Sequence, residues 1–303
     1  MRPEILIICG PTGSGKSQLA LNLAKILDTE IISADSLAIY KGLDIGTAKP
    51  TKEEMKEVKH NLVDVVSPFE NFSVSDFESL AIPHVNRLIS NGKIPIICGG
   101  TGFYINSILY KMSYGNITEN TEIREKYLKL AEEKGVDYVY NELIKVDEQS
   151  AKKIHKNDIV RVVRALEIFY GTGKKKSMQN DKNIPRFSYL AVTIDLDRQV
   201  LYDRINRRVD IMLENGLVDE VKRLMDLGVT KENQCMQGIG YKEVYDAIKL
   251  NDFTNLADLI KLNSRHYAKR QITFFKKLEN LHYLKGDYNY LLSETLKLLG
   301  YIK

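Results

Sequence analysis

The stretch Glu4–Ser17, which reads EILIICGPTGSGKS, decides the fold of this chain. Its first six residues form a short, isoleucine-rich run typical of a buried strand, and Gln18–Leu27 repeats its apolar residues at helical spacing. Between these two segments, Gly10–Ser17 fits the pattern G-x-x-x-x-G-K-[ST]. In such a loop, glycine lets the backbone wrap around phosphate oxygens, and the following helix adds its dipole and free N–H groups. The stretch therefore predicts a site for a di- or triphosphate, without identifying which one.

Every residue of this phosphate loop is a candidate ligand: Gly10, Pro11, Thr12, Gly13, Ser14, Gly15, Lys16 and Ser17. Lys16 supplies a positive charge, and the hydroxyl of Ser17 can ligate a magnesium ion. Mg²⁺ is accordingly the expected cofactor.

Short apolar runs and helical patterns alternate through the rest of the first hundred residues. The expected strands are Ile31–Ala34, Leu62–Val66 and Ile94–Cys98, and the strand pattern returns at Tyr189–Ile194. Short apolar strands that alternate with helices are typical of a parallel sheet covered by helices on both faces. We therefore predict an α/β fold with a parallel sheet, followed by a chain that is helical almost to its end.

The middle of the chain has a different character. Three charged, amphipathic patterns there predict helices: Thr121–Lys134, Asp137–Lys145 and Asp158–Tyr170. A loop at 171–186 follows them. We expect two domains, an α/β core formed by 1–115 and 187–303 with a helical C-terminal part, and a mostly helical insertion at 116–186.

Composition narrows the possible partners and the compartment. The 303 residues include 44 basic and 40 acidic side chains, and a net charge of +4 predicts that local patches would hold any nucleic acid. No apolar run approaches the roughly 18 residues that span a bilayer, and no secretory segment precedes the first strand. Cys9, Cys98 and Cys235 lie far apart, which favours neither a disulfide framework nor a zinc site. We expect a cytoplasmic protein, and by default a monomer without an obligate protein partner.

An acidic residue, Asp35, follows the second expected strand. Ligands of open parallel sheets bind beyond the carboxyl ends of the strands, so Asp35 should lie beside the phosphate loop. A carboxylate there can ligate a metal through water, accept a proton from a nucleophile, or simply stabilise a turn. The residues by themselves leave these roles open.

Six blocks of sequence follow one another along nearly the whole chain. They are GPTGSGKS at 10–17, DSLAIYKGLDIGTAKP at 35–50, CGGTGFY at 98–104, HKNDIVRVVRALE at 155–167, RINRRVDIMLENGLVDEV at 204–221, and QGIGYKE with YAKRQITFFKK at 237–277. Together they resemble the tRNA dimethylallyltransferases, also called tRNA isopentenyltransferases. Lys156 departs from the family, which more often has proline after the histidine, and this affects the rigidity of one turn. The chain also lacks the Cys/His-bearing tail of some eukaryotic relatives, as expected for a bacterial-type enzyme.

The resemblance implies a P-loop NTPase-like fold with a helical insertion domain that contacts tRNA, and a transferase activity. Enzymes of this family transfer the dimethylallyl group of dimethylallyl diphosphate to N6 of adenosine 37, beside the anticodon of tRNAs that read codons beginning with U. The products are N6-isopentenyladenosine and diphosphate. The phosphate loop would then hold a prenyl diphosphate, and whether ATP also binds there is left open.

Four residues are the catalytic candidates that the resemblance implies. Asp35 corresponds to the general base, and Thr101 to a threonine near the diphosphate and the incoming adenosine. Arg208 corresponds to an arginine that reaches the diphosphate from the second half of the chain, and Lys16 acts from the phosphate loop. The competing structural roles are a helix cap for Thr101 and a surface charge for Arg208.

The family's target base is stacked in the anticodon stem-loop, so the enzyme must flip it out to reach N6. Ten residues are candidate tRNA contacts: Asp35, Ser36, Leu37, Ala38, Thr101, Arg124, Arg161, Arg164, Lys269 and Arg270. The last two belong to the segment 265–277, which is basic and contains no acid. Phosphate contacts of this kind supply affinity and register but no sequence information.

Three other functions compete with this prediction. An adenylate isopentenyltransferase would not need the helical insertion or the basic segment. A kinase would need an arginine-bearing lid over ATP, and the sequence has no convincing one. A non-catalytic RNA-binding ATPase would have no use for an acid beside the phosphate loop.

Overall fold

The computed structural model of the chain describes residues 2–112, 121–178 and 185–302. The chain divides into two compact units, Met1–Leu109 with Pro185–Lys303, and Tyr110–Ile184. The expected start of the insertion near residue 116 lies outside the described residues, as does part of the expected loop 171–186. Within the described ranges, no helix is both long enough and apolar enough to cross a membrane.

The described part of the first unit is built on one six-stranded sheet, in the order β3-β2-β4-β1-β5-β6. Each pair of neighbouring strands is parallel. The strands are β1 (Ile5–Cys9), β2 (Ile31–Ser33), β3 (His60–Asn61), β4 (Ile96–Gly99), β5 (Tyr189–Ile194) and β6 (Leu281–Leu284). This topology confirms the predicted α/β fold with a parallel sheet flanked by helices.

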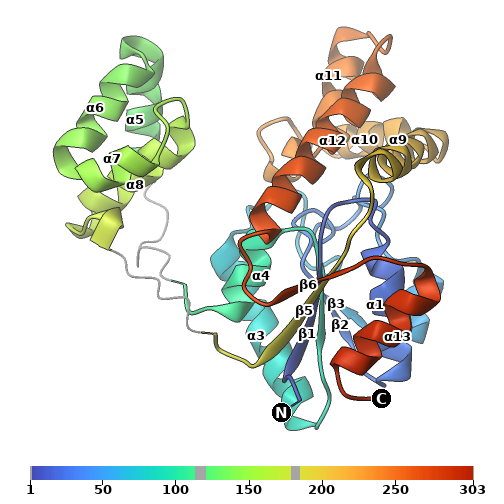
Figure 1. Ribbon diagram of the computed structural model, residues 1–303. Helices are drawn as coiled ribbons and strands as arrows, with labels where there is room; N and C mark the ends of the chain where they lie inside the picture. Colours follow the sequence, from blue (N-terminus) through green and yellow to red (C-terminus); the bar gives the residue numbers. More distant parts are fainter. Residues whose placement is uncertain (1, 113–120, 179–184, 303) are drawn as a thin grey trace. The chain divides into compact units, whose positions relative to one another are not determined.

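Helices cover both faces of this sheet, with α1 and α13 on one face and α3 and α4 on the other (Figure 1). Helices α9 to α12 lie beyond the carboxyl ends of the strands. The helices of this unit are α1 (Lys16–Ile26), α2 (Lys52–Glu57), α3 (Val74–Ser90), α4 (Gly102–Leu109), α9 (Arg198–Glu214), α10 (Leu217–Asp226), the 3₁₀ turn η2 (Gln234–Gln237), α11 (Tyr241–Leu250), α12 (Leu256–Phe275) and α13 (Tyr288–Leu298). The core between sheet and helices joins Leu6 and Ile8 of β1 to Leu19 of α1 and Leu291 of α13.

Two expectations about the strands are wrong. The third strand is His60–Asn61, not Leu62–Val66, because Leu62 and Asp64 have φ angles of 63° and 56° that end the extended backbone. The C-terminal region is also not purely helical, since β6 forms the edge of the sheet beside β5. Two of its four residues are exposed, so β6 lacks the apolar run that identifies a buried strand.

The second unit is a helical cluster, and its three predicted helices are confirmed with small shifts of their ends. Its helices are α5 (Thr121–Lys134), α6 (Val136–Val146), α7 (Glu148–Lys153), α8 (Ile159–Thr172) and the 3₁₀ turn η1 (Lys176–Met178). Val139 and Leu143 of α6 pack with Val162 and Leu166 of α8 in its core. The sequence did not reveal α7, because six residues are too short to display helical periodicity.

In the first unit, Glu220 of α10 shapes the segment that follows β2. Its side chain is buried, and its carboxylate accepts hydrogen bonds from the backbone N–H groups of Asp44, Ile45 and Gly46 at 2.8, 2.9 and 3.2 Å. The Tyr241 hydroxyl donates another at 2.6 Å. Burial next to this carboxylate raises the pKa of Tyr241, which therefore remains a donor. These bonds satisfy a buried charge that would otherwise be costly.

We predict that Glu220→Gln destabilises the first unit. The NH₂ group of the glutamine would face backbone N–H groups of the segment 44–46, which are donors themselves and would lose their acceptor. The free energy of unfolding should fall by about 2–3 kcal/mol, the cost of leaving buried donors unsatisfied. Urea denaturation followed by circular dichroism measures this change. The matched control is Asp219→Asn on the same helix, whose side chain is 82% exposed and should change stability by less than about 0.5 kcal/mol. Equal effects of the two substitutions would contradict the anchoring role.

Candidate active site

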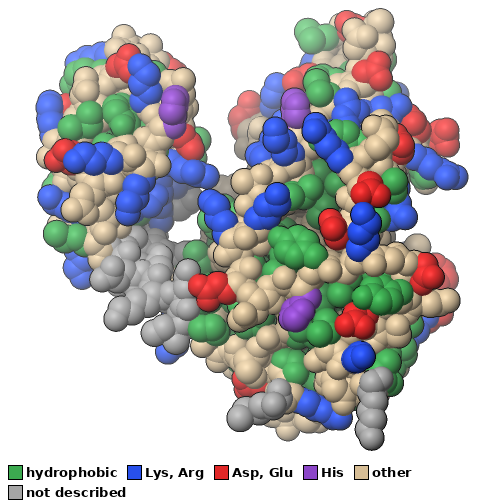
Figure 2. All heavy atoms as spheres, in the orientation of Figure 1, with side chains coloured by type: hydrophobic (Ala, Val, Ile, Leu, Met, Phe, Trp, Pro, Cys, Tyr) green, Lys and Arg blue, Asp and Glu red, His purple; other side chains and the backbone are tan. Residues whose placement is uncertain are grey.

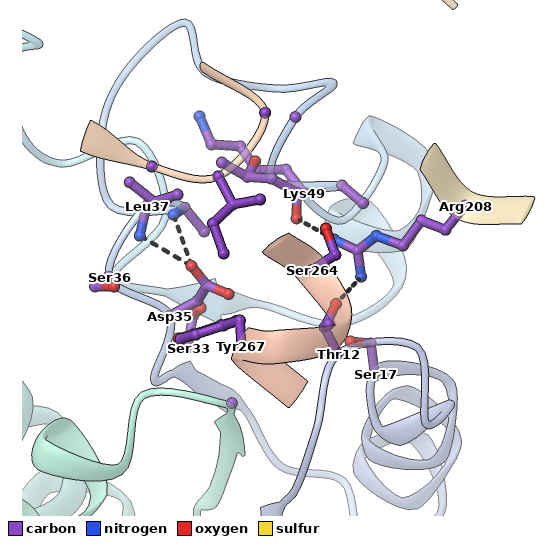
Figure 3. Close-up of a pocket in the computed structure, with 18 of the residues that line it drawn as sticks. Thr12, Ser17, Ser33, Asp35, Ser36, Leu37, Lys49, Arg208, Ser264 and Tyr267 are labelled. Atoms are coloured by element: carbon purple, nitrogen blue, oxygen red, sulfur yellow. Dashed lines mark hydrogen bonds between the residues drawn. The ribbon is translucent and has the colours of Figure 1, made fainter. Parts of the chain in front are cut away.

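A pocket of about 680 Å³ lies beyond the carboxyl ends of β1, β2 and β4, within the first unit. Its walls come from the phosphate loop, from the segments 33–38 and 46–50, and from helices α9 and α12. Figure 3 shows Thr12, Asp35, Arg208 and Tyr267 arranged around it. The pocket therefore brings together residues that are more than two hundred positions apart in the sequence.

The phosphate loop connects β1 to α1, as the sequence predicts. It turns at Gly10, which has a φ of 140°, and a Cβ there would lie 2.6 Å from the Thr193 hydroxyl of β5. The Lys16 ammonium donates to the Pro11 carbonyl at 3.2 Å, and burial lowers the pKa of Lys16. Ser14 Oγ is buried, and the described residues offer it no hydrogen-bond partner. These features fit a loop whose remaining partners come from a bound anion.

Arg208 of α9 points into the pocket, whereas Arg204 and Arg207 of the same helix are exposed. Its guanidinium donates to the Thr12 hydroxyl at 2.9 Å and to the Thr47 carbonyl at 3.1 Å. Burial lowers the pKa of Arg208 and the nearby Asp35 charge opposes that shift, but an arginine stays protonated throughout. Arg208 is thus a fixed positive charge at the phosphate loop, and not one of the surface charges of α9.

Asp35 lies two residues beyond the end of β2 and lines the pocket. One carboxylate oxygen, Oδ1, accepts hydrogen bonds from the N–H groups of Leu37 and Ala38 at 2.9 and 3.2 Å (Figure 3). The described residues give the other oxygen, Oδ2, no hydrogen bond. The turn therefore occupies only one oxygen of Asp35, and the other oxygen is left for a second role.

Thr101 follows β4, immediately before α4. Its hydroxyl oxygen accepts a hydrogen bond from the backbone N–H of Ser36 at 3.1 Å and donates to the Ser36 hydroxyl at 3.3 Å. The Thr101 N–H donates to the Ala34 carbonyl at 3.1 Å. The side chain is thus directed toward the segment that carries Asp35, and not toward the first turn of α4.

Several pocket residues were not among the predicted site residues, and they include Thr47, Ser264, Tyr267 and Gln271. Burial raises the pKa of Tyr267 to about 12, and its phenol lies among the side chains of Asp35, Thr101 and Gln271. Tyr267 and Gln271 are four residues apart on α12, so one helix face delivers both. In the sequence, this spacing of four within a basic segment was the only indication of Tyr267 and Gln271 as site residues. The sequence alone does not show which face of the helix is turned toward the pocket.

The oxygen donors around the phosphate loop suit a hard cation. Ser17, Ser33 and Asp35 all line the pocket, and hydroxyl and carboxylate oxygens are the ligands that Mg²⁺ prefers. Magnesium usually keeps several waters and takes one or two protein ligands together with substrate phosphates. The donor set therefore fits Mg²⁺ bound with a diphosphate.

Cys98 of β4 also lines the pocket. Burial raises the pKa of its thiol to about 11, so the side chain is protonated at neutral pH. A thiol is a poor nucleophile compared with a thiolate. Chemistry in this pocket therefore fits direct transfer between two bound substrates better than a covalent intermediate at cysteine.

Basic side chains gather over α12 on the face of the first unit shown in Figure 2. Lys269, Arg270, Lys276 and Lys277 are exposed. Arg265, in contrast, donates to the Asn206 side chain of α9 at 2.6 Å and serves the packing of α12 against α9. In the basic segment, Arg265 therefore contributes to helix packing, whereas the other four basic side chains are accessible to a polyanion.

The three arginines predicted in the second unit differ in their surroundings. Arg124 of α5 and Arg164 of α8 contact the fully buried Glu167 carboxylate at 3.2 and 2.9 Å. Arg161 is more exposed, with 63% of its side chain accessible, and contacts Asp158 at 3.2 Å. Arg124 and Arg164 therefore have a structural partner, while Arg161 keeps most of its surface open to solvent.

The chain is similar in sequence to proteins of one known family. A family model described as IPP transferase matches residues 38–278. The tRNA dimethylallyltransferase of Acetivibrio thermocellus is 45% identical over 288 residues, which are 94% of this chain and 92% of the relative. That of Bacillus cytotoxicus is 48% identical over 280 residues, covering 91% of this chain and 88% of the relative.

Solved structures agree as well. The tRNA isopentenylpyrophosphate transferase of Bacillus halodurans is 39% identical, with a TM-score of 0.74 over 98% of this chain and 96% of that protein. A eukaryotic dimethylallyltransferase, captured acting on tRNA, is 32% identical, with a TM-score of 0.79 over 93% of this chain and 73% of that one. At this level of identity and coverage, the chain belongs to the IPP transferase family.

Proposed function

We propose that this protein transfers the dimethylallyl group of dimethylallyl diphosphate to N6 of adenosine 37 in tRNAs that read codons beginning with U. The relatives named tRNA dimethylallyltransferase support the reaction. The observation that carries the proposal is one pocket lined by the phosphate-loop residues Thr12, Lys16 and Ser17, by Arg208 and by the Asp35 carboxylate. A prenyl diphosphate needs the first two, and a weakly nucleophilic amine needs the third.

The side chains divide the chemistry between them. As the allylic C–O bond breaks, its electron pair passes to the diphosphate oxygen, and Lys16, Arg208 and the N–H groups of the loop stabilise the growing charge. The N6 lone pair forms the new C–N bond, and Asp35 takes the proton that N6 loses. Ser17 would hold Mg²⁺, which would supply further neutralisation of the diphosphate.

The tRNA would be held by accessible charges of each unit. Lys269 and Arg270 of α12 and Arg161 of α8 are the candidates whose exposure suits phosphate contacts. Arg270 also stacks over the Tyr267 ring at 5.6 Å, which brings it to the rim of the pocket. We therefore place the flipped adenosine between the segment 35–38 and α12.

We also propose that the protein works as a monomer in the cytoplasm. Its three cysteines are buried and unpaired by disulfides in the structure, and burial raises the pKa of Cys9 to about 12 and that of Cys235 to about 11. Cysteines that form no disulfide suit a reducing compartment.

The proposed reaction is tested by incubating the purified protein with labelled dimethylallyl diphosphate, Mg²⁺ and either tRNA or AMP. We expect label in tRNA, at an adenosine that becomes N6-isopentenyladenosine in a nucleoside digest. An anticodon stem-loop with guanosine at position 37 is the matched control. Label in AMP alone would support an adenylate isopentenyltransferase instead. ATP turnover without transfer would support a kinase or an RNA-binding ATPase.

We predict that Asp35→Asn lowers kcat by about 10²–10⁴, the usual contribution of general acid–base catalysis. Asparagine can keep the oxygen that accepts from Leu37 and Ala38, so the turn should survive, but it cannot take a proton. The KM values for both substrates should change little. A magnesium titration separates the two roles of the carboxylate, since recovery of activity at high Mg²⁺ would assign Asp35 to the metal and reject the general base.

We predict that Arg161→Ala and Arg164→Ala have different effects. Loss of one phosphate contact at Arg161 should raise the KM for tRNA and reduce the log–log salt slope by about 0.7, the value per phosphate of a single strand. Loss of Arg164 should instead lower the thermal stability of the second unit, because it removes a partner of the buried Glu167. The measurements are kinetics between 50 and 200 mM KCl and thermal unfolding. An unchanged slope in Arg161→Ala would assign that arginine to structure.

A further inference from the structure

Gln271 is a buried amide near the C-terminal end of α12, the helix that also carries the exposed Lys269 and Arg270. Its Oε1 accepts a hydrogen bond from the N–H of Thr12 at 2.9 Å, and its Nε2 donates to the carbonyl of Gly100 at 3.0 Å. A buried amide is costly unless its polar atoms are paired, and here both ends are paired. Both partners are backbone groups of loops that line the candidate active site.

The two loops need such a connection, because the sheet aligns them only up to its last ladder position. Cys9 of β1 and Gly99 of β4 are paired in the sheet. Thr12 lies three residues beyond that pair, in the loop that would bind the diphosphate. Gly100 lies one residue beyond it and directly precedes Thr101. The amide therefore fixes the two loops to each other at the level of the pocket, where no strand does so among the described residues.

The chemistry of the contact requires an amide. One atom must accept from an N–H group, and another atom of the same planar group must donate to a carbonyl. A glutamate would turn an acceptor toward the Gly100 carbonyl, and an aliphatic side chain would leave both backbone groups unpaired. The close approach also explains the glycine, since a Cβ at Gly100 would lie 2.1 Å from Nε2.

Thr12 is held from two directions at once. Arg208 of α9 donates to its hydroxyl at 2.9 Å, while Gln271 of α12 accepts from its N–H. The contact with Arg208 places a positive charge at the phosphate loop. The contact with Gln271 connects that loop to Gly100, which precedes Thr101. Thr101 in turn accepts a hydrogen bond from the N–H of Ser36, the residue after Asp35. A leaving group and a general base that lie on separate loops can cooperate only if the distance between the loops is fixed.

We propose that Gln271 is a positioning residue of the transfer reaction, which holds the diphosphate loop and the Thr101 loop at the separation that in-line transfer requires. This inference rests on the proposed function. It assigns Gln271 no contact with substrate. The residue acts through Thr12 and Gly100.

The test uses two substitutions that break the same contact from opposite sides. Gln271→Ala removes the amide and keeps a good helix former, and Gly100→Ala displaces the amide without removing it. Each should lower kcat by about 10–100-fold, because small misplacements of reacting groups can cost about 100-fold. The KM values for dimethylallyl diphosphate and tRNA should stay within about 3-fold. Both changes break the same interaction, so their effects should not multiply. The kcat of the double variant should lie within about 3-fold of the kcat of the slower single variant.

The matched control is Thr273→Val, which lies on the exposed side of the same helix and donates within α12 to the Lys269 carbonyl. It should leave kcat unchanged. Defects of the two site variants that multiply, or a raised KM for tRNA with normal kcat, would overturn the proposal. Wild-type protein without transfer activity would contradict the proposed function instead, and an active wild type with a normal Gln271→Ala would overturn the positioning role alone.

Hydrogen–deuterium exchange gives a readout that does not depend on activity. In Gln271→Ala, exchange should rise in the peptides that contain 10–17 and 99–104 and stay unchanged in the strands β1 and β4. Faster exchange throughout the first unit would show a general loss of structure, and unchanged exchange in both loops would show that the amide does not hold them. Either result would overturn the positioning role.

Discussion

Backbone N–H groups that bind a phosphate cannot also be tied to the protein, so the loop Gly10–Ser17 must be held in place by other contacts. Two of these contacts are made at Thr12, by Arg208 to its hydroxyl and by Gln271 to its N–H. Both partners come from the second half of the chain, beyond the insertion. The phosphate loop is therefore local in sequence but depends on long-range contacts for its position.

In each unit, a buried glutamate also holds groups from other parts of the chain in position. Glu220 accepts from three consecutive backbone N–H groups and so shapes the segment whose Thr47 carbonyl receives Arg208. Glu167 is fully buried in the second unit and contacts Arg124 and Arg164. In both cases the carboxylate is satisfied by several donors, which is the condition for burying a charge at low cost. The first fixes a loop of the active site, and the second fixes two arginines on neighbouring helices.

The sequence was sufficient for the parts of the site that depend on neighbours along the chain. The phosphate loop is defined by glycines, lysine and serine at fixed spacing, and Asp35 is defined by its position after a strand. The roles of Gln271, Thr47 and Glu220 could not be predicted, because each depends on a contact across at least 160 positions. The strand β6 escaped prediction for a related reason, since an edge strand with exposed residues needs its neighbour β5 to be recognised.

The structure presents two kinds of positive charge, which suit the two substrates of the proposed reaction. In the proposed reaction the leaving diphosphate would meet Lys16 and Arg208, which are partly buried and make hydrogen bonds, so water would screen their charge less than that of exposed side chains. An RNA backbone would meet a different set, such as Lys269 and Arg270, whose side chains are exposed. A net charge of only +4 is compatible with both tasks because neither depends on the average surface. Catalysis needs a few fixed charges in one pocket, and tRNA binding needs accessible charges along a helix face.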